Sequence, residues 1–384
     1  MRLLLYCIAG LVADWLLYVV WAALPLRADE LGATPLQLGL LMASSSAVYV
    51  TMSIVLGAAA DRVPRSILAR IGTLLMIGAC VLIPVADSAW HLIALAPLVG
   101  LAGSFFWPAI QAAVGSEAMA GRLERDIGFF NVSWSVGKAL GFLTGGALMH
   151  RWGFSNALLA AAAGAALVFF VHPLRDPRVG TRSVLDDQAD PRLRLAFLRL
   201  SWISNFAIYG VGAAIGSQCV KWIKSLGAVD HDLFYGRFLG AIFAAQTAAF
   251  VVLGVTRAWT YKRWPIVASQ LVLAAACFAL PVLPAPWMLL ALAPVIGVGL
   301  GVGYAASIFY SLHTPAGHGR YAGFHEAIIG ASNFLVPLVA GALASAFDLR
   351  WPYWLSGLLC LAVLAAGHAV FRATSTTSAK ESTT

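Results

Sequence analysis

Three ionisable side chains stand inside long apolar stretches of the chain: Asp14, Lys138 and Glu326. An ionisable group near the centre of a bilayer costs roughly 2.5–3.5 kcal/mol even on an insertion scale, so each predicts a functional site. Counted at about 1.5 Å per helical residue, Asp14 and Lys138 lie at similar depths near the midplane. We expect them to face one cavity, or else to form a structural ion pair. The carboxylates would carry protons, and the ammonium would bind an anionic group or exchange partners.

Two asparagines extend this pattern. Asn131 lies seven residues before Lys138, and Asn333 lies seven residues after Glu326, so each pair shares one stripe of its helix. We expect these stripes to form facing walls of a cavity between two helical bundles. His325 adjoins Glu326, but adjacent residues point to different helix faces, so packing is an alternative for this histidine. No second histidine stands at the spacing of a zinc-protease helix, and we predict neither a metal nor a cofactor.

Aromatic and amide side chains are softer candidates for substrate contacts. Tyr18 follows Asp14 by one helical turn, and Trp134 precedes Lys138 by one turn. The remaining candidates are Trp107, Tyr209, Tyr304 and Asn205. For any single aromatic residue, plain packing in the core is the competing interpretation.

The elements that must position these residues are membrane-spanning helices. Of 384 residues, 60% are hydrophobic and only 11% are charged, whereas a soluble domain carries about 25% charged residues. This composition excludes a disordered chain, a disulfide scaffold and an ordinary cytosolic enzyme. The five cysteines lie far apart in apolar stretches, where we expect small buried hydrophobic residues. With about 20 residues per span, we predict twelve spans, approximately at 3–26, 35–58, 66–86, 90–114, 126–149, 154–173, 197–220, 233–256, 264–283, 286–311, 321–347 and 352–371.

A long polar stretch from His172 to Arg199 divides these spans into two groups of six. We predict an N-terminal bundle at 1–173, a linker at 174–196, a C-terminal bundle at 197–372 and a disordered tail at 373–384. The expected fold is an all-α polytopic membrane protein in which twelve helices form two pseudo-symmetric six-helix bundles. Roughly three times as many lysines and arginines fall on the side of the termini as on the other side. This bias predicts a protein of the cell (inner) membrane with the linker and both termini in the cytoplasm.

The second half of the sequence repeats the first at a nearly constant offset of 195 to 197 residues. A parallel repeat of six spans predicts two bundles related by an axis along the membrane normal, with a substrate site between them near mid-bilayer. The matches, in chain order, are Leu31-Gly32-Ala33 with Leu226-Gly227-Ala228, Leu56-Gly57 with Leu253-Gly254, Ala96-Pro97 with Ala293-Pro294, Arg125-x-x-Gly128-Phe129 with Arg320-x-x-Gly323-Phe324, and Gly146-Ala147-Leu148 with Gly341-Ala342-Leu343.

The loop after the second predicted span carries a known signature. Its sequence GAAADRVPRS, from Gly57 to Ser66, resembles the major facilitator superfamily motif G-x-x-x-D-R-x-G-R-R. Gly57, Asp61, Arg62 and Arg65 match, while Pro64 and Ser66 depart from the motif. The resemblance implies a conformational latch in which the acid and the arginines pair with neighbouring helix ends in the outward-open state. A charged turn that staples two helices is the alternative.

The fifth predicted span resembles the antiporter motif of the same family, g-x-x-x-G-P-x-x-G-G. The matching glycines are Gly137, Gly141, Gly145 and Gly146; Phe142 replaces the proline, which the repeat retains as Pro337 beside Gly341. Small residues at this spacing let helices approach closely, so plain packing is the alternative. Ala96 lies near the position in span four where many drug/proton antiporters of the family carry an arginine. That difference argues against proton-driven drug export.

These patterns predict a secondary-active transporter that moves a small organic solute by alternating access, with proton coupling and with export favoured over import. Import of an organic anion or a sugar, and lipid translocation, are alternatives; a non-transporting membrane sensor or scaffold is the alternative from another class. Neither an ATPase motif nor a nucleophile–base pair stands in the sequence, so we expect no enzyme. The expected partners are a small-molecule substrate, the lipid bilayer and the proton, without nucleic acid. The resemblance implies a monomer.

Overall fold

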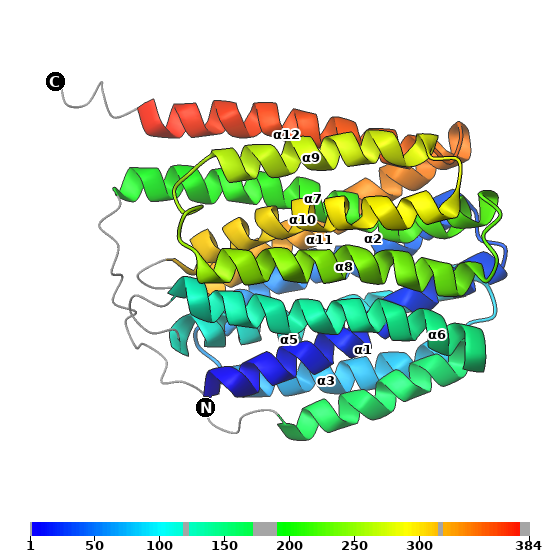
Figure 1. Cartoon of the computed structure of the whole chain (residues 1–384). Helices are drawn as coiled ribbons and strands as arrows, with labels where there is room; N and C mark the ends of the chain where they lie inside the picture. Colours follow the sequence, from blue (N-terminus) through cyan, green and yellow to red (C-terminus); the bar gives the residue numbers. More distant parts are fainter. Residues whose placement is uncertain (1, 118–122, 172–189, 314–317, 377–384) are drawn as a thin grey trace.

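The computed structural model describes residues 2–117, 123–171, 190–313 and 318–376, and every regular element within them is helical (Figure 1). The elements are α1 (Arg2–Glu30), α2 (Pro35–Ala59), α3 (Arg65–Leu82), η1 (Ile83–Val85), α4 (Ala89–Leu95), α5 (Pro97–Glu117), α6 (Leu123–Val171), α7 (Pro191–Ser225), α8 (His231–Val255), α9 (Trp264–Ala279), η2 (Leu280–Val282), α10 (Pro286–Leu312), α11 (His318–Ala346) and α12 (Trp351–Thr376).

The all-α, multi-pass architecture expected from composition is confirmed. Nine helical segments of the described chain are long and apolar enough to cross a membrane. This number is lower than the twelve spans expected from the sequence, so the count of twelve stays a prediction. Two of the predicted spans fall in α6, whose two helical parts meet at Gly153, where φ is 75° and ψ is 175°. Figure 1 shows the chain reversing direction there.

Several predicted boundaries are corrected by the structure. The span predicted at 90–114 is one spanning segment, Ala89–Ser116, in which the helix is interrupted between α4 and α5, where Pro97 has no backbone N–H to donate. α7 begins at Pro191 rather than at 197, since proline is favoured in a first helical turn and the Asp190 side chain caps it by accepting the Arg192 N–H at 2.9 Å. α12 continues to Thr376, beyond the predicted start of the tail at 373. Residues 172–189 and 377–384, which hold most of the predicted linker and tail, lie outside the described residues.

The helices run side by side, and α1 begins at the same end of the molecule at which α12 ends (Figure 1). We call this end the terminal face and the other end the opposite face. The internal repeat is visible in the turns of the opposite face. Gly32 after α1 and Gly227 after α7 are 195 residues apart and have φ values of 75° and 74°, a backbone conformation that favours glycine.

Glycines bring the first half, α1–α6, into close contact with the second half, α7–α12, at both faces. At the terminal face, a Cβ added to Gly57 of α2 would lie 2.5 Å from the Cα of Gly323 of α11. The repeat mates Gly254 of α8 and Gly128 of α6 form the related crossing, where a Cβ on Gly254 would lie 3.0 Å from the Cα of Gly128. Only glycine permits such backbone approach.

The opposite face has a second pair of crossings. A Cβ added to Gly146 of α6 would lie 3.1 Å from the Cα of Gly236 of α8. In α2 and α11, a Cβ on Gly39 would lie 3.4 Å from the Cα of Gly341. The same offsets of 197 and 195 residues relate these two pairs, so the sequence repeat corresponds to a repeat of helix crossings in space. The exact bounds of the predicted bundles stay a prediction.

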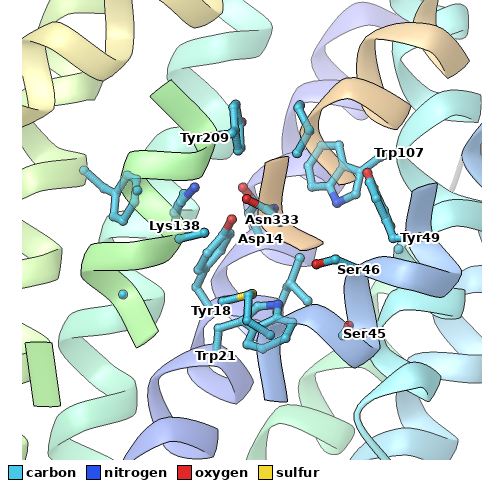
Figure 2. A pocket seen from close by; sticks show the side chains of 18 of the residues that line it. Asp14, Tyr18, Trp21, Ser45, Ser46, Tyr49, Trp107, Lys138, Tyr209 and Asn333 are labelled. Carbon is cyan, nitrogen blue, oxygen red and sulfur yellow. The ribbon is translucent and has the colours of Figure 1, made fainter. Parts of the chain in front are cut away.

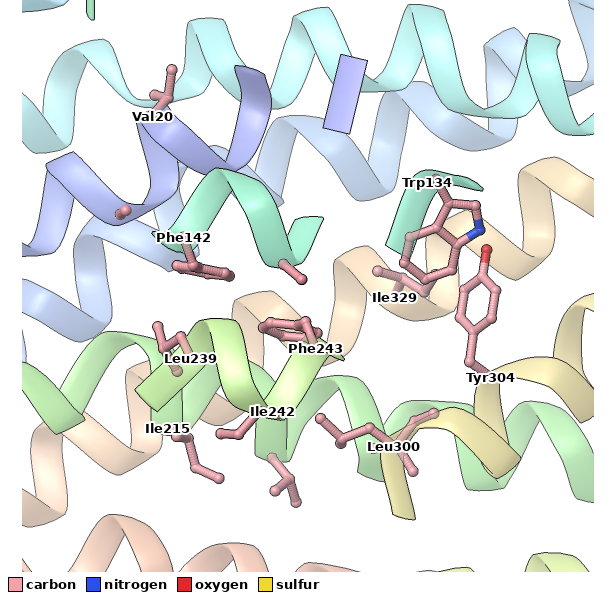
Figure 3. Close-up of a cluster of buried hydrophobic side chains, with 14 of the residues drawn as sticks. Val20, Trp134, Phe142, Ile215, Leu239, Ile242, Phe243, Leu300, Tyr304 and Ile329 are labelled. Carbon is pink, nitrogen blue, oxygen red and sulfur yellow. The ribbon is translucent and has the colours of Figure 1, made fainter. Parts of the chain in front are cut away.

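An aromatic and aliphatic core fills much of the space between the halves (Figure 3). Phe142 of α6 stacks on Phe243 of α8, with ring centroids 5.3 Å apart and an interplanar angle of 9°. Trp134 of α6 meets Tyr304 of α10 edge to face at 4.8 Å. All five cysteines are free and buried, as expected for small hydrophobic residues.

Candidate functional site

A cavity of about 140 Å³ lies between the two halves, close in size to an engineered protein cavity that holds benzene (Figure 2). Eight helices line it, four from each half: α1, α2, α5 and α6 on one side, and α7, α8, α10 and α11 on the other. Of the predicted site residues, the structure places nine on this cavity: Asp14, Tyr18, Trp107, Trp134, Lys138, Tyr209, Tyr304, Glu326 and Asn333.

Lys138 is surrounded by aromatic rings from both halves. Its Nζ atom lies 4.0 Å from the ring centroid of Phe243 and 4.3 Å from that of Tyr18. The rings of Tyr209 and Trp134 follow at 5.5 and 5.9 Å. The negative faces of these rings stabilise the ammonium. Within the described residues Lys138 has no ion pair with Asp14, so the two line one cavity without the direct bridge that was the structural alternative.

Glu326 is held by side chains of the other half. Its carboxylate accepts hydrogen bonds from the Tyr49 hydroxyl of α2 and from the Gln111 amide of α5, and only 4% of the residue is exposed. The Gln111 amide also donates to the Tyr304 hydroxyl at 3.3 Å. A group on α11 is therefore tied directly to the first half of the chain. Any movement of the halves that opens the cavity must change these contacts.

Several polar groups on the cavity are available to a ligand, among them the Oε1 atoms of Gln111 and Gln246, which have no partner within the described residues. Asp14, 3% exposed, makes no side-chain hydrogen bond within the described residues, and the Oδ1 atom of Asn333 is buried without a partner there. Figure 2 shows the side chains of Asp14 and Asn333 near that of Lys138. A buried polar atom without a partner costs free energy, and a hydrogen bond from a ligand group or a water molecule would remove that cost.

Three predicted site residues lie away from the cavity. Asn131 accepts the indole N–H of Trp134 at 3.2 Å, and it is one turn from the Gly128 crossing, where the halves are already in contact. Asn131 and Lys138 lie on the same helix, α6, but the cavity extends along α6 only from Trp134 to Phe142 and does not include Asn131. His325 is fully buried, with its Nδ1 2.9 Å from the Ser307 hydroxyl, as its packing alternative implied. Asn205 is buried elsewhere in α7.

Sequence reasoning missed Gln111, Tyr49 and Phe243. Gln111 had a usable signal, because it is an amide inside an apolar span, one helical turn after Trp107. Tyr49 and Phe243 had none, since an aromatic residue in an apolar helix is usually part of the core. Their importance depends on which helices cross near Glu326 and Lys138.

The signature loop closes the terminal face. The Asp61 carboxylate accepts the backbone N–H groups of Gly319 and Arg320 in the first turn of α11, at 2.9 and 3.1 Å. This is a favourable place for an anion, because a helix N-terminus presents unpaired N–H groups and a positive dipole end. The buried Arg65 donates to the carbonyls of Ala60 and Ala112 at 2.9 Å and lies 3.8 Å from Asp61. Its contacts fix the loop between α2 and α3.

Arg62, the remaining charged residue of the signature, is exposed. The glycines of the antiporter-like motif mostly face α1: a Cβ on Gly141 would lie 2.5 Å from the Trp15 carbonyl, and one on Gly145 would lie 2.7 Å from the Ala22 Cβ. Gly137 likewise packs on α1, Gly146 crosses α8, and Gly341 and Pro337 meet α2. These contacts agree with the packing interpretation of the motif.

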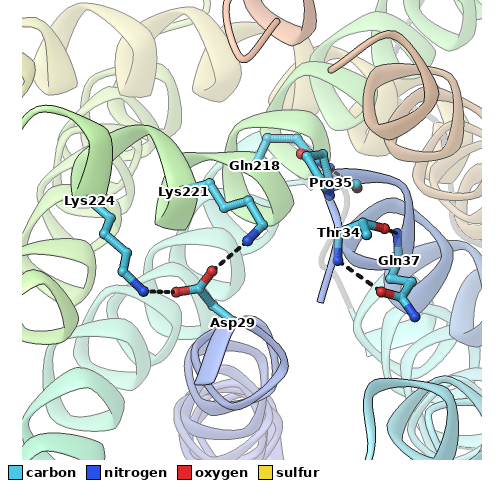
Figure 4. Close-up of polar contacts among 7 residues, drawn as sticks. All are labelled: Asp29, Thr34, Pro35, Gln37, Gln218, Lys221 and Lys224. Carbon is cyan, nitrogen blue, oxygen red and sulfur yellow. Dashed lines mark hydrogen bonds and ion pairs between the residues drawn. The ribbon is translucent and has the colours of Figure 1, made fainter. Parts of the chain in front are cut away.

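Ionic contacts between the halves close the opposite face (Figure 4). The Asp29 carboxylate at the end of α1 binds the ammonium groups of Lys221 and Lys224 on α7, at 2.7 and 2.9 Å. His150 of α6 lies 3.0 Å from Asp232 of α8. Both faces are thus held by contacts between the halves, and the cavity lies between the two faces.

This arrangement defines a class: a multi-pass helical membrane protein whose two related halves enclose a polar and aromatic cavity. The family description Major Facilitator Superfamily matches residues 6–314. The chain belongs to this superfamily, whose members are transporters that bind small molecules within a membrane, so the family predicted from the signature loop is confirmed. Transport rather than an enzymatic reaction is the activity to which the family points.

Solved structures share the fold. A bacterial homologue of the human lysosomal transporter Spinster, in an inward-facing and occupied conformation, has a TM-score of 0.69 at 16% identity, and the match covers 97% of this chain and 96% of that one. The human organic anion transporter MFSD10 (TETRAN) has a TM-score of 0.71 at 13% identity, with 95% of this chain and 99% of that chain covered. No curated protein matches the chain.

Proposed function

We propose that this protein is a secondary-active transporter that carries a small organic solute by alternating access through the central cavity. The observation that carries this proposal is the shared construction of the cavity. The ammonium of Lys138 lies among rings from both halves, and Glu326 of the second half is bound by Tyr49 and Gln111 of the first. A ligand placed there contacts both halves at once. Its binding free energy therefore biases their relative position, as alternating access requires.

Proton coupling is the second part of the proposal. Asp14 and Glu326 are the acids of the cavity, and each is almost completely buried. A proton on either carboxylate neutralises a charge that is costly at this depth. Lys138 then binds an anionic group of the substrate or responds to the charge on Asp14. The protein works as a monomer in the inner membrane with both termini in the cytoplasm, so that the terminal face is the cytoplasmic one.

Export of aromatic or amphipathic compounds is the favoured function, because the chain carries an antiporter-like motif in α6 and the lining of the cavity suits such compounds. Ten aromatic residues line it: Tyr18, Trp21, Tyr49, Trp107, Trp134, Phe142, Tyr209, Tyr235, Phe243 and Tyr304. Uptake of an organic anion is the second candidate. The specific observation in its favour is Lys138, whose charge faces rings rather than a carboxylate within ion-pair distance. One structural neighbour is described as an organic anion transporter, although its likeness to this chain establishes the fold alone.

Asp14→Asn tests the coupling. A compound that raises the thermal stability of the purified protein, found by screening metabolites and drugs, serves as the transported probe. In proteoliposomes, the Asp14→Asn variant should lose transport driven by an imposed pH gradient but keep counterflow of the probe, because the substituted amide can bind solute but cannot carry the proton. Asp87→Asn is the control, since Asp87 is exposed outside the cavity with a local His91 contact. Gradient-driven transport that survives in Asp14→Asn contradicts the coupling role.

Lys138→Ala separates the two substrate classes. For an anionic probe, removal of the ammonium should weaken binding by at least tenfold, since charged hydrogen bonds contribute about 1.5–3 kcal/mol. Lys138→Arg keeps the charge and is the matched control. Unchanged affinity of Lys138→Ala for an anion would assign Lys138 to structure alone. If the wild-type protein transports no probe, and Asp14 and Lys138 prove dispensable for its role in the cell, the sensor or scaffold alternative replaces the transporter.

A further inference from the structure

A groove separate from the central cavity lies between the ends of α6 and α8 at the terminal face. It has a volume of about 510 Å³ and runs past the crossing of Gly128 and Gly254. Its walls are apolar and open to the outside: Phe129, Val251 and Val255 line it with exposed fractions of 52%, 48% and 82%. Such exposure on a membrane helix is a surface for lipid chains.

Two arginines lie at the terminal-face end of these apolar walls. Arg125 near the start of α6 and Arg257 just after α8 both line the groove. The guanidinium of Arg125 lies 5.4 Å from the ring centroid of Phe129, so the charge stands directly beside the apolar wall. Asp126, the acid next to Arg125 in the sequence, is not among the lining residues. The groove thus combines a positive end with an apolar length.

The internal repeat shows what this crossing lacks. At the related crossing of α2 and α11, the Asp61 carboxylate ties the end of α2 to the backbone of Gly319 and Arg320. The residue 197 positions after Asp61 is Ala258, so the end of α8 has no carboxylate at this place. Arg125 is retained as the mate of Arg320, and Arg257 replaces Ala60. At the end of α8, an alanine thus stands in place of the acid and a base in place of an alanine, while the start of α6 carries Asp126 where α11 has Tyr321.

We propose that this groove binds an anionic phospholipid from the leaflet at the terminal face. Its phosphate lies between Arg125 and Arg257, and one acyl chain follows Phe129, Val251 and Val255. Guanidinium groups bind phosphate oxygens in a bidentate manner, which suits two arginines at the headgroup level. The lipid phosphate supplies to α6 and α8 the negative charge that Asp61 supplies to α2 and α11. A free phosphate ion would leave the apolar length of the groove unfilled.

Native mass spectrometry of the full-length protein tests this site, with phosphatidylglycerol and phosphatidylcholine titrated in detergent. One phosphatidylglycerol should bind more tightly than phosphatidylcholine. Each basic residue beside an anionic lipid contributes roughly a fivefold factor in affinity. The double variant Arg125→Gln/Arg257→Gln should therefore bind phosphatidylglycerol more than tenfold more weakly. Arg320→Gln, which removes the repeat mate of Arg125 at the crossing that already has Asp61, should bind it like the wild type.

A second variant tests the same site by gain of charge. Ala258→Asp places an acid at the position equivalent to Asp61, and it should weaken phosphatidylglycerol binding without removing either arginine. If the double variant does not fold, the single arginine variants and Ala258→Asp carry the test. Equal binding of the two lipids by the wild type, or equal weakening by Arg320→Gln, overturns the proposal. The assignment to a lipid is overturned if millimolar inorganic phosphate displaces phosphatidylglycerol from the protein in neutral detergent.

Discussion

The terminal face and the opposite face are closed by the same helices, α2 against α11 and α6 against α8, at glycines that the repeat relates. Their polar contacts differ. The terminal face relies on the Asp61 carboxylate, 30% exposed, which accepts backbone N–H groups. At the opposite face, Asp29, with a side chain only 4% exposed, binds two lysines, and His150 meets Asp232. A buried charge is screened less than an exposed one, and Asp29 is more buried than Asp61, although Lys224 is 57% exposed. The glycines supply the fit at both faces, and the charges favour closure of the opposite face.

Bulk at the glycine crossings should have the largest effect. Gly57→Val places a branched side chain against the backbone of α11 at the terminal face, and Gly341→Val does the same against α2 at the opposite face. Overpacking of this kind costs about 1–3 kcal/mol and occasionally more, which is roughly a five- to 150-fold change or greater in the population of the closed face. Distances between spin labels across each face should show Gly57→Val open at the terminal face and Gly341→Val open at the opposite face.

Gly78→Val is the control for these variants, because a Cβ at Gly78 of α3 meets no atom within 4 Å. It shares the change in helix propensity without a contact between the halves. If Gly57→Val and Gly341→Val open the same face, or if Gly78→Val matches either, the glycine crossings do not determine closure.

Loss of the buried charge on Asp29 should have the next largest effect. Asp29→Asn removes the anion between Lys221 and Lys224, and charged hydrogen bonds contribute about 1.5–3 kcal/mol. We expect the opposite face to open at least tenfold more often, with the terminal face unchanged. Glu30→Gln is a close control, since the adjacent Glu30 pairs with Arg27 inside the same helix. Equal opening in the two variants would show that the contact with α7 has no particular role.

A smaller shift is expected at the terminal face from Asp61→Asn. The amide oxygen still accepts one of the two N–H groups from the first turn of α11, so the second hydrogen bond and the attraction between the charge and the helix end are lost, the latter typically 0.3–1 kcal/mol. The terminal face should open at least twofold more often in the same spin-label measurement, but less than the opposite face does in Asp29→Asn. A shift larger than that of Asp29→Asn would reverse the ranking of the two faces.

Much of the fold could be predicted because its signal is local. A run of apolar residues identifies a membrane helix without knowledge of its neighbours, and the repeat predicted the related halves. The errors are also local. The preference of Pro191 for a first helical turn sets an earlier start for α7, and Pro97 interrupts the helix inside a span whose extent was predicted correctly. Neither effect changes hydropathy, so the apolar pattern did not indicate them.

The candidate site could be predicted only in part. Asp14, Lys138 and Glu326 are visible in the sequence because buried charge is costly, and the structure places all three on the cavity, although their roles stay predictions. Their partners were not visible. The Phe243 ring beside Lys138 and the Gln111 amide beside Glu326 come from helices more than a hundred residues away in the chain. Such contacts depend on the crossing of helices, which a single sequence does not specify.

The burial of every native thiol has a practical consequence. Cys7, Cys80, Cys219, Cys277 and Cys360 are free and buried, and none lines the central cavity. A thiol reagent added from the aqueous phase therefore finds no ready target in the wild-type chain. Reporter cysteines introduced at either face can be read against an unmodified background, without first replacing five well-packed residues.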